Sequence, residues 1–137
     1  MATKPLSLRV PLQVKQDLEH LSRRFGTSPA TLGADYVTQG VRTTLHPSIE
    51  FRQTPAGSMA YLRGVRLPVW LAVRTVADCN GNAQRAARLL KLPVLLLKAA
   101  LLYAKAFPDE IAADRAAGHR SLDDLDNLVP NHSFLRV

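Results

Sequence analysis

The sequence predicts a mainly α-helical protein made of two small domains and an acidic tail, and three patterns support this prediction. Apolar residues recur every three or four positions through much of the chain, which is the period of amphipathic helices. Prolines and glycines divide the chain into segments of helical length, with one stretch that suits a short β-hairpin. The charge changes sign toward the C-terminus. The expected domains are residues 1–46, 47–117 and 118–137.

The first 46 residues combine one short strand with two helices. Residues 6–10 alternate apolar and polar side chains, which predicts a strand that ends at Pro11. A helical stripe over 14–25 predicts the first helix. Ser28, as a helix cap before a proline, predicts a second helix that ends near Leu45. We expect this second helix to bury Leu32, Tyr36, Val37 and Val41.

A lone strand would leave its backbone donors and acceptors unpaired at a sheet edge. Two copies that pair their strands antiparallel would satisfy these groups and bury the helical stripes, so the segment predicts an intertwined homodimer. Arg9-Val10-Pro11 ends the strand and Gly26-Thr27-Ser28 separates the helices. With these features, residues 4–46 resemble the ribbon-helix-helix (CopG/Arc-like) repressors. The resemblance implies a DNA-binding dimer.

In such dimers the strand face opposite the helices enters the DNA major groove. That face would hold Ser7 and Arg9, and an arginine can hydrogen-bond both O6 and N7 of guanine. Lys4 would contact phosphate, and Thr27 and Ser28 would clamp the DNA backbone, because free amides at a helix N-terminus attract anions. Alternatively, Ser7 and Arg9 only solvate an exposed strand, and Ser28 is only a helix cap.

Residues 47–117 predict a small helical or winged helix-turn-helix-like domain with a short β-hairpin. The hairpin is expected over 49–62, and helices over 68–78, 83–90, 94–107 and 109–117. The inner face of the first of these helices should hold Val69, Trp70, Val73, Val76 and Ala77. Trp70 is expected in the core rather than at a contact surface.

Three segments of this domain carry a second resemblance, GVRLPVW at 64–70, AALLYA at 99–104 and PDEI at 108–111. With them, the domain is similar to the antitoxin-associated domain-of-unknown-function family number 433, of the VapB type. Members of that family are typically encoded beside a PIN-like ribonuclease toxin. The resemblance therefore implies an antitoxin.

The formal charge is +3 over residues 1–46, +7 over 47–108 and −3 over 109–137. The basic residues 1–108 are suited to binding a polyanion, and the acidic residues 109–137 are suited to binding a different partner.

Five basic residues of the second domain are candidate contacts. Arg85, Arg88 and Lys91 lie three residues apart, so they could follow DNA phosphates along one helix, or form only a solvated face. Arg63 and Arg66 flank Gly64 at a turn and are candidate toxin contacts.

Residues 118–137 predict a flexible segment, because Gly118 and Pro130 interrupt helical order. Leucines at helical spacing among aspartates suit folding onto a basic groove, such as the RNA-binding cleft of a ribonuclease. The expected toxin contacts are Leu122, Leu125, Leu128 and Phe134. Alternatively, this tail limits nonspecific DNA binding, or packs back on its own domain through Phe134 and Leu135.

The sequence predicts neither an enzyme site nor a cofactor or metal. The four histidines lack cysteines or paired carboxylates at metal-ligand spacing, Cys79 has no base placed beside it, and no glycine-rich phosphate loop is present. The single cysteine, the absence of a signal-peptide pattern and the absence of ~20 consecutive apolar residues predict a cytoplasmic protein without a membrane span.

The expected function is that of an antitoxin in a type II toxin-antitoxin pair. The chain would act as a homodimer or higher even oligomer, neutralise a PIN-like ribonuclease toxin and repress its own promoter by binding operator DNA. The alternative is a stand-alone ribbon-helix-helix transcriptional repressor of metabolic, plasmid or chromosomal genes. A third class, a nonspecific architectural DNA protein, would bind with a steep salt dependence and little sequence preference.

Overall fold

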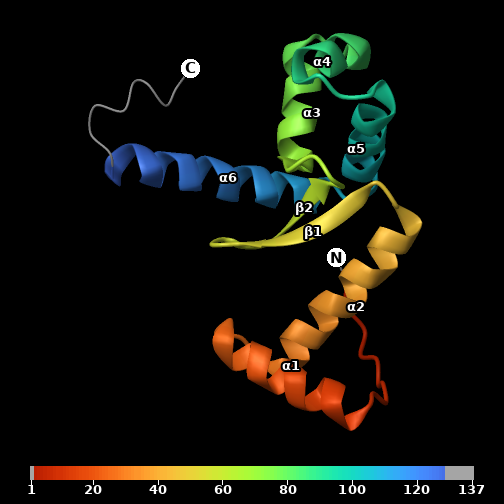
Figure 1. Ribbon diagram of the computed structural model, residues 1–137, viewed down its shortest axis with the longest axis vertical. Coiled ribbons are helices and arrows are strands. Elements are labelled where there is room, and N and C mark those ends of the chain that lie inside the picture. Colours follow the sequence, from red (N-terminus) through yellow and green to blue (C-terminus); the bar gives the residue numbers. More distant parts are fainter. Residues whose placement is uncertain (1, 129–137) are drawn as a thin grey trace. The chain divides into compact units, whose positions relative to one another are not determined.

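The computed structural model describes residues 2–128, and the side chains of residues 2–119. This part of the chain is mainly helical, with one small antiparallel sheet (Figure 1). The chain divides into two compact units, residues 1–41 (unit 1) and residues 42–137 (unit 2). Among the described residues, no helix is both long enough and apolar enough to cross a membrane.

Unit 1 contains helix α1 (Leu12–Arg24) and most of helix α2 (Pro29–Leu45), as the sequence predicted. Between them the chain reverses at Gly26, whose φ of +66° lies in the left-handed region that glycine adopts most easily. The amide of Thr27 then donates to the Ser22 carbonyl at 2.9 Å, which closes the turn. The two predicted helices are therefore correct in position and length.

The predicted strand over residues 6–10 is absent from the single chain, because residues 2–11 adopt no regular secondary structure. A strand needs a neighbour for its backbone hydrogen bonds, and unit 1 provides no second strand. The side chains expected on its buried face are exposed instead, Leu6 by 70%, Leu8 by 59% and Val10 by 47%. Because the ribbon needs the strand of a second chain, the pairing of residues 6–10 stays a prediction.

The expected burial along α2 is also only partly correct. Leu32 is buried, whereas Tyr36, Val37 and Val41 are exposed by 44%, 39% and 55%. These exposed side chains lack an apolar surface to cover them, because a unit of two helices is too small to enclose both sides of either helix.

Unit 2 opens with the predicted hairpin, formed by β1 (Ile49–Thr54) and β2 (Gly57–Leu62). A third strand, β3 (Leu67–Pro68), pairs with the end of β2 and completes an antiparallel sheet of order β1-β2-β3. Sequence analysis missed β3, because two residues are too few to show an alternating pattern.

The other helices of unit 2 are α3 (Val69–Asp78), α4 (Ala83–Leu90), α5 (Val94–Ala106) and α6 (Pro108–Leu128). Prolines stand directly before α3 and α5 and open α6, where the missing N–H costs nothing. Helices α3 and α5 lie side by side, α4 crosses one end of this pair, and α6 passes the other end beside β2 (Figure 1).

The core of unit 2 lies between the sheet and the helices. Its largest fully buried side chains are Tyr103, Ile49, Leu62, Leu97 and Val69. Trp70 is 6% exposed, which confirms that it is a core residue. On α3, however, Ala77 is exposed and Ala72 is fully buried, so the inner face is centred slightly differently from the prediction.

The predicted helix break at Gly118 is wrong, since α6 continues through it to Leu128. A glycine inside a helix costs roughly 1 kcal/mol in propensity, but at this position it permits close packing. A Cβ atom on Gly118 would lie within 2.7 Å of Trp70 Cε2, so only glycine lets α6 pass the indole ring at this distance. Phe134 and Leu135 lie outside the described residues.

Candidate nucleic-acid interface

Helices α3 and α4 form a helix-turn-helix arrangement joined by a four-residue turn. The turn uses two left-handed residues, Asn80 with φ of +56° and Gly81 with φ of +80°, to reverse the chain direction. Asn82 then caps α4, because its Oδ1 accepts a hydrogen bond from the Arg85 amide at 3.0 Å.

Helix α4 is divided sharply into a buried and an exposed side. Small residues, Ala83, Ala86 and Ala87, form the buried side and allow the helix to lie close against the core. The exposed side carries Gln84, Arg85, Arg88 and Leu89, and Lys91 follows at the helix end. The structure therefore places the predicted cations Arg85, Arg88 and Lys91 on the surface.

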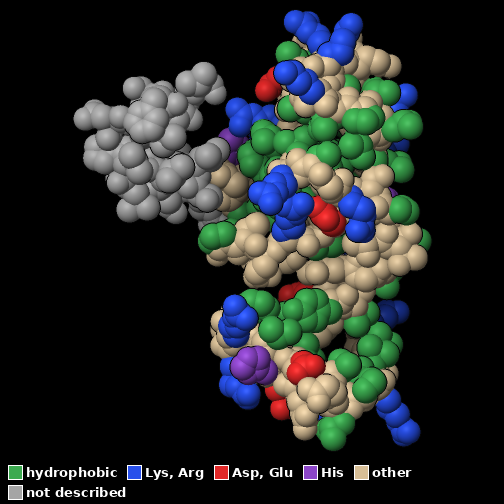
Figure 2. Space-filling view, viewed as in Figure 1, with side chains coloured by type: hydrophobic (Ala, Val, Ile, Leu, Met, Phe, Trp, Pro, Cys, Tyr) green, Lys and Arg blue, Asp and Glu red, His purple; other side chains and the backbone are tan. Residues whose placement is uncertain are grey.

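These three cations have no acidic partner within 4.0 Å in the part of the chain whose side chains are described. In the same part, Arg42, Arg52 and Arg74 are each paired with a carboxylate. Lys and Arg side chains gather at the end of unit 2 where α4 lies (Figure 2). The side chains along α4 thus keep their full positive charge available for an anion.

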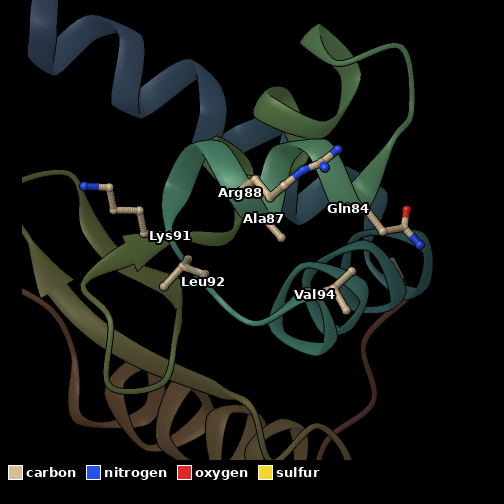
Figure 3. A pocket seen from close by; sticks show the side chains of 6 residues that line it. All are labelled: Gln84, Ala87, Arg88, Lys91, Leu92 and Val94. Carbon is tan, nitrogen blue, oxygen red and sulfur yellow. The ribbon is translucent and has the colours of Figure 1, made fainter.

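A shallow, open pocket of about 540 Å³ lies where α4 meets the start of α5. Its lining combines the aliphatic side chains of Leu92 and Val94 with the polar or charged ones of Gln84, Arg88 and Lys91 (Figure 3). Arg88 and Lys91 extend in different directions from the helix in this view, so they flank a surface rather than converge on one point. Such an arrangement suits successive phosphates of a nucleic-acid backbone better than a single small anion.

The candidate DNA contacts of unit 1 are not assembled in the single chain, and all are exposed except Thr27, which is partly buried and whose amide donates to the Ser22 carbonyl. Lys4, Ser7 and Arg9 lie on the irregular segment before α1. Ser28 caps α2, since its Oγ accepts from the Thr31 amide at 3.1 Å and donates to Thr31 Oγ1 at 2.8 Å. The structure thus shows Ser28 as a helix cap. Phosphate binding at this helix N-terminus stays a prediction.

The candidate toxin contacts are dispersed. The guanidinium of Arg63 donates to the carbonyls of Pro47 (2.9 Å) and Ile49 (3.1 Å), so it fastens the entry to β1. Arg66 lies in a turn with φ of +50° and is exposed. Leu122, Leu125 and Leu128 belong to α6, but their side chains are not described, and Phe134 lies outside the described residues.

A polar cluster that the sequence did not reveal joins the end of α2 to α5 and α6. The Arg42 guanidinium forms an ion pair with Glu110, and the Tyr103 hydroxyl donates to the same carboxylate. The guanidinium also lies 4.1 Å from the centroid of the Phe107 ring. Burial, followed by the hydrogen bond to Glu110, raises the pKa of Tyr103 above its ordinary value. The cluster has a structural role, because each of its members is bound to another member inside unit 2.

Asp114 on α6 is a second group that sequence analysis missed. Its Oδ2 accepts a hydrogen bond from the Ala60 amide at 3.5 Å. Burial raises the pKa of Asp114 to about 6, an effect that this hydrogen bond opposes and the nearby Glu110 increases.

The raised pKa of Asp114 predicts that unit 2 loses stability as the pH rises from about 4 to about 6. The folded protein keeps this proton up to about pH 6, whereas the unfolded chain releases it near the ordinary pKa of 3.8. Because the carboxylate is partly solvated, we expect a loss of about 1 kcal/mol in unfolding free energy. Urea titrations of the wild type and of Asp114→Asn should differ in slope between these pH values. Parallel pH profiles would contradict the prediction.

No protein-family model, curated protein or solved structure matches the chain.

Proposed function

We propose that the chain is a dimeric DNA-binding repressor that serves as the antitoxin of a type II toxin-antitoxin pair. The observation that supports it best is the row of unpaired cations, Arg85, Arg88 and Lys91, on the exposed side of the second helix of a helix-turn-helix arrangement. Cations that neutralise phosphates and release counterions supply much of the free energy of DNA binding. In helix-turn-helix proteins the second helix lies in the major groove, so exposed cations on and beside α4 would reach DNA phosphates in the proposed complex.

Dimerisation is supported by the apolar side chains that unit 1 leaves exposed. They are Leu6, Leu8, Val10, Leu12, Val14, Phe25, Tyr36, Val37 and Val41. A monomeric protein seldom exposes so many large apolar side chains within 41 residues. In the proposed dimer, residues 6–10 of two chains pair as a ribbon, the helices cover these side chains, and the outer face of the ribbon presents Ser7 and Arg9 to operator DNA.

The antitoxin role is supported by the sequence resemblance at residues 64–70, 99–104 and 108–111 and by the acidic composition after residue 108. The proposed partner is a PIN-like ribonuclease toxin, whose RNA-binding cleft would be basic. The candidate contacts are Arg66 and the leucines of α6, with Arg63 supporting the turn through its carbonyl contacts.

Substitution of Arg9 by alanine tests base recognition by the ribbon. The variant should bind operator DNA more weakly by ~1–3 kcal/mol, since one bidentate contact to a base is lost in each chain. It should still form the dimer, because in the proposed ribbon Arg9 would lie on the face away from the helices. Arg24→Ala, which removes an exposed cation of α1, is the control. Fluorescence anisotropy on promoter and scrambled DNA gives the affinities, and unchanged operator affinity in Arg9→Ala would contradict the ribbon assignment.

The antitoxin role is tested by purifying the tagged chain from its native cell with nuclease present. A small partner in near-stoichiometric amount, toxic when expressed alone and released by Leu122→Asp/Leu125→Asp, would support the proposal. Recovery of the chain alone at the mass of a dimer would favour the stand-alone repressor.

A further inference from the structure

Helix α5 is apolar on its outer side as well as on its inner side. Only two of its 13 residues, Lys98 and Lys105, are charged. On the inner side, Leu97, Ala100 and Tyr103 are fully buried against the core. A helix that is apolar all round is normally buried on all sides, which this helix is not.

The outer side of α5 carries a regular apolar stripe. Leu95 is exposed by 73% and Leu102 by 61%, and Ala99 and Ala106 continue the row. The spacings of four, three and four residues are those of the contact positions in a pair of packed helices. We call these four residues the α5 stripe. Its pattern indicates a helix as the partner.

Lys98 and Lys105 are exposed beside the α5 stripe, on one flank of it. If two copies of α5 packed antiparallel, Lys98 of one chain would face Lys105 of the other, and like charges across a helix interface repel. Neither lysine has an acidic partner within 4.0 Å among the described side chains. The charge therefore favours a helix that is acidic as well as apolar.

The second half of α6 is a segment of this chemistry. Residues 120–128 read RSLDDLDNL, with three leucines at helical spacing and three aspartates. This segment cannot reach α5 of its own chain, because α6 begins beside the end of α5 and runs away from it as one continuous helix (Figure 1). At 1.5 Å per residue, position 120 lies ~18 Å along the helix from Pro108 and position 128 lies ~30 Å along it.

We propose that the α5 stripe of one chain binds the second half of α6 from a second copy of the chain. The apolar stripe would pack on the leucines, and Lys98 and Lys105 would pair with the aspartates. The contact can form twice around a two-fold axis, so it closes into a finite assembly. It depends on neither DNA nor a toxin, and a toxin that binds Leu122 and Leu125 would have to displace α5.

Disulfide trapping in the full-length chain tests this contact. Leu102→Cys and Leu125→Cys chains carrying different tags are co-expressed, purified through both tags and mildly oxidised. Cys79 is buried and stays in place. The expected product is a 102–125 disulfide between differently tagged chains, identified by peptide mapping. Gln53→Cys, at an exposed position of the hairpin, replaces Leu102→Cys in the control. We expect the 102–125 yield to exceed the 53–125 yield by about tenfold, which corresponds to ~1.4 kcal/mol.

Charge reversal tests the basis of the contact. Lys98→Glu/Lys105→Glu in the Leu102→Cys chain should abolish the preference for 102–125, and Asp123→Lys/Asp126→Lys in the other chain should restore it. Circular dichroism checks that each variant is folded. Equal yields of the 102–125 and 53–125 disulfides would overturn the proposal. A predominant 102–102 disulfide would also overturn it and would indicate that two copies of α5 pair with each other. Failure of the reversed pair to restore the preference would overturn it as well.

Discussion

Alanine substitution of Arg85, Arg88 and Lys91 together is expected to lower the affinity for double-stranded DNA by about a hundredfold at physiological salt. The three cations are exposed and unpaired, so their removal takes away phosphate contacts without leaving a buried charge in the protein. In a dimer six cations are lost, and the slope of log affinity against log salt should decrease by about 5. Titrations at several salt concentrations measure both quantities.

A matched control separates a local contact from a general effect of charge. Lys15→Ala/Arg24→Ala/Arg115→Ala removes the same number of exposed cations at positions outside α4. It should change the affinity much less, because long-range attraction is screened beyond about 8 Å at physiological ionic strength. If both triple variants lose the same affinity, the side chains of α4 are only a solvated face.

Gly118→Ala is expected to destabilise unit 2 by about 3 kcal/mol, although alanine is the better helix former. The new Cβ would lie within 2.7 Å of Trp70 Cε2, and the Trp70 ring is itself buried in the core. The indole Nε1 has no hydrogen-bond partner among the described residues, so contact with its neighbours alone holds the ring. Either α6 or the indole must therefore shift. Urea unfolding of the wild type and the variant measures the difference.

Two variants show whether this loss comes from the contact with Trp70. Gly40→Ala places the same change in the interior of α2, where a Cβ meets nothing within 4 Å, and should raise the unfolding free energy by roughly 0.5–1 kcal/mol. In a Trp70→Phe background, Gly118→Ala should cost clearly less, because the smaller ring leaves room for the methyl group. An unchanged cost in that background would show that the indole is not the cause.

Local sequence signals determined most of the helix boundaries. Prolines and glycines interrupt the helical stripes, and Ser28 is a capping residue in the sequence as it is in the structure. Three-residue spacing also identified Arg85, Arg88 and Lys91 as a candidate row. The helix boundaries could be predicted because capping, turn formation and helical period depend on residues that are neighbours along the chain, whereas DNA contact by Arg85, Arg88 and Lys91 stays a prediction.

Other features depend on residues distant in the sequence, and only the tertiary structure decided them. Gly118 signals a break, yet α6 continues through it because Trp70 lies 48 positions earlier in the sequence and directly beside it in space. The link between Arg42 and Glu110 spans 68 positions. Residue spacing could not identify Trp70 as the neighbour of Gly118 or Glu110 as the partner of Arg42, since such contacts exist only after the core has formed.

The same reason explains why the sequence alone could not show the exposure and pairing of the cations at α4. Spacing predicted that Arg85, Arg88 and Lys91 lie along one helix side, but not whether carboxylates face them. In the structure Lys91 follows the end of α4, and Arg88 and Lys91 extend in different directions. The packing of Ala83, Ala86 and Ala87 turns that side outward, and it leaves the three cations without acidic partners among the described side chains. Composition and period determined the helices and their charges, whereas burial and pairing were decided by packing, which brings together residues that the sequence keeps apart.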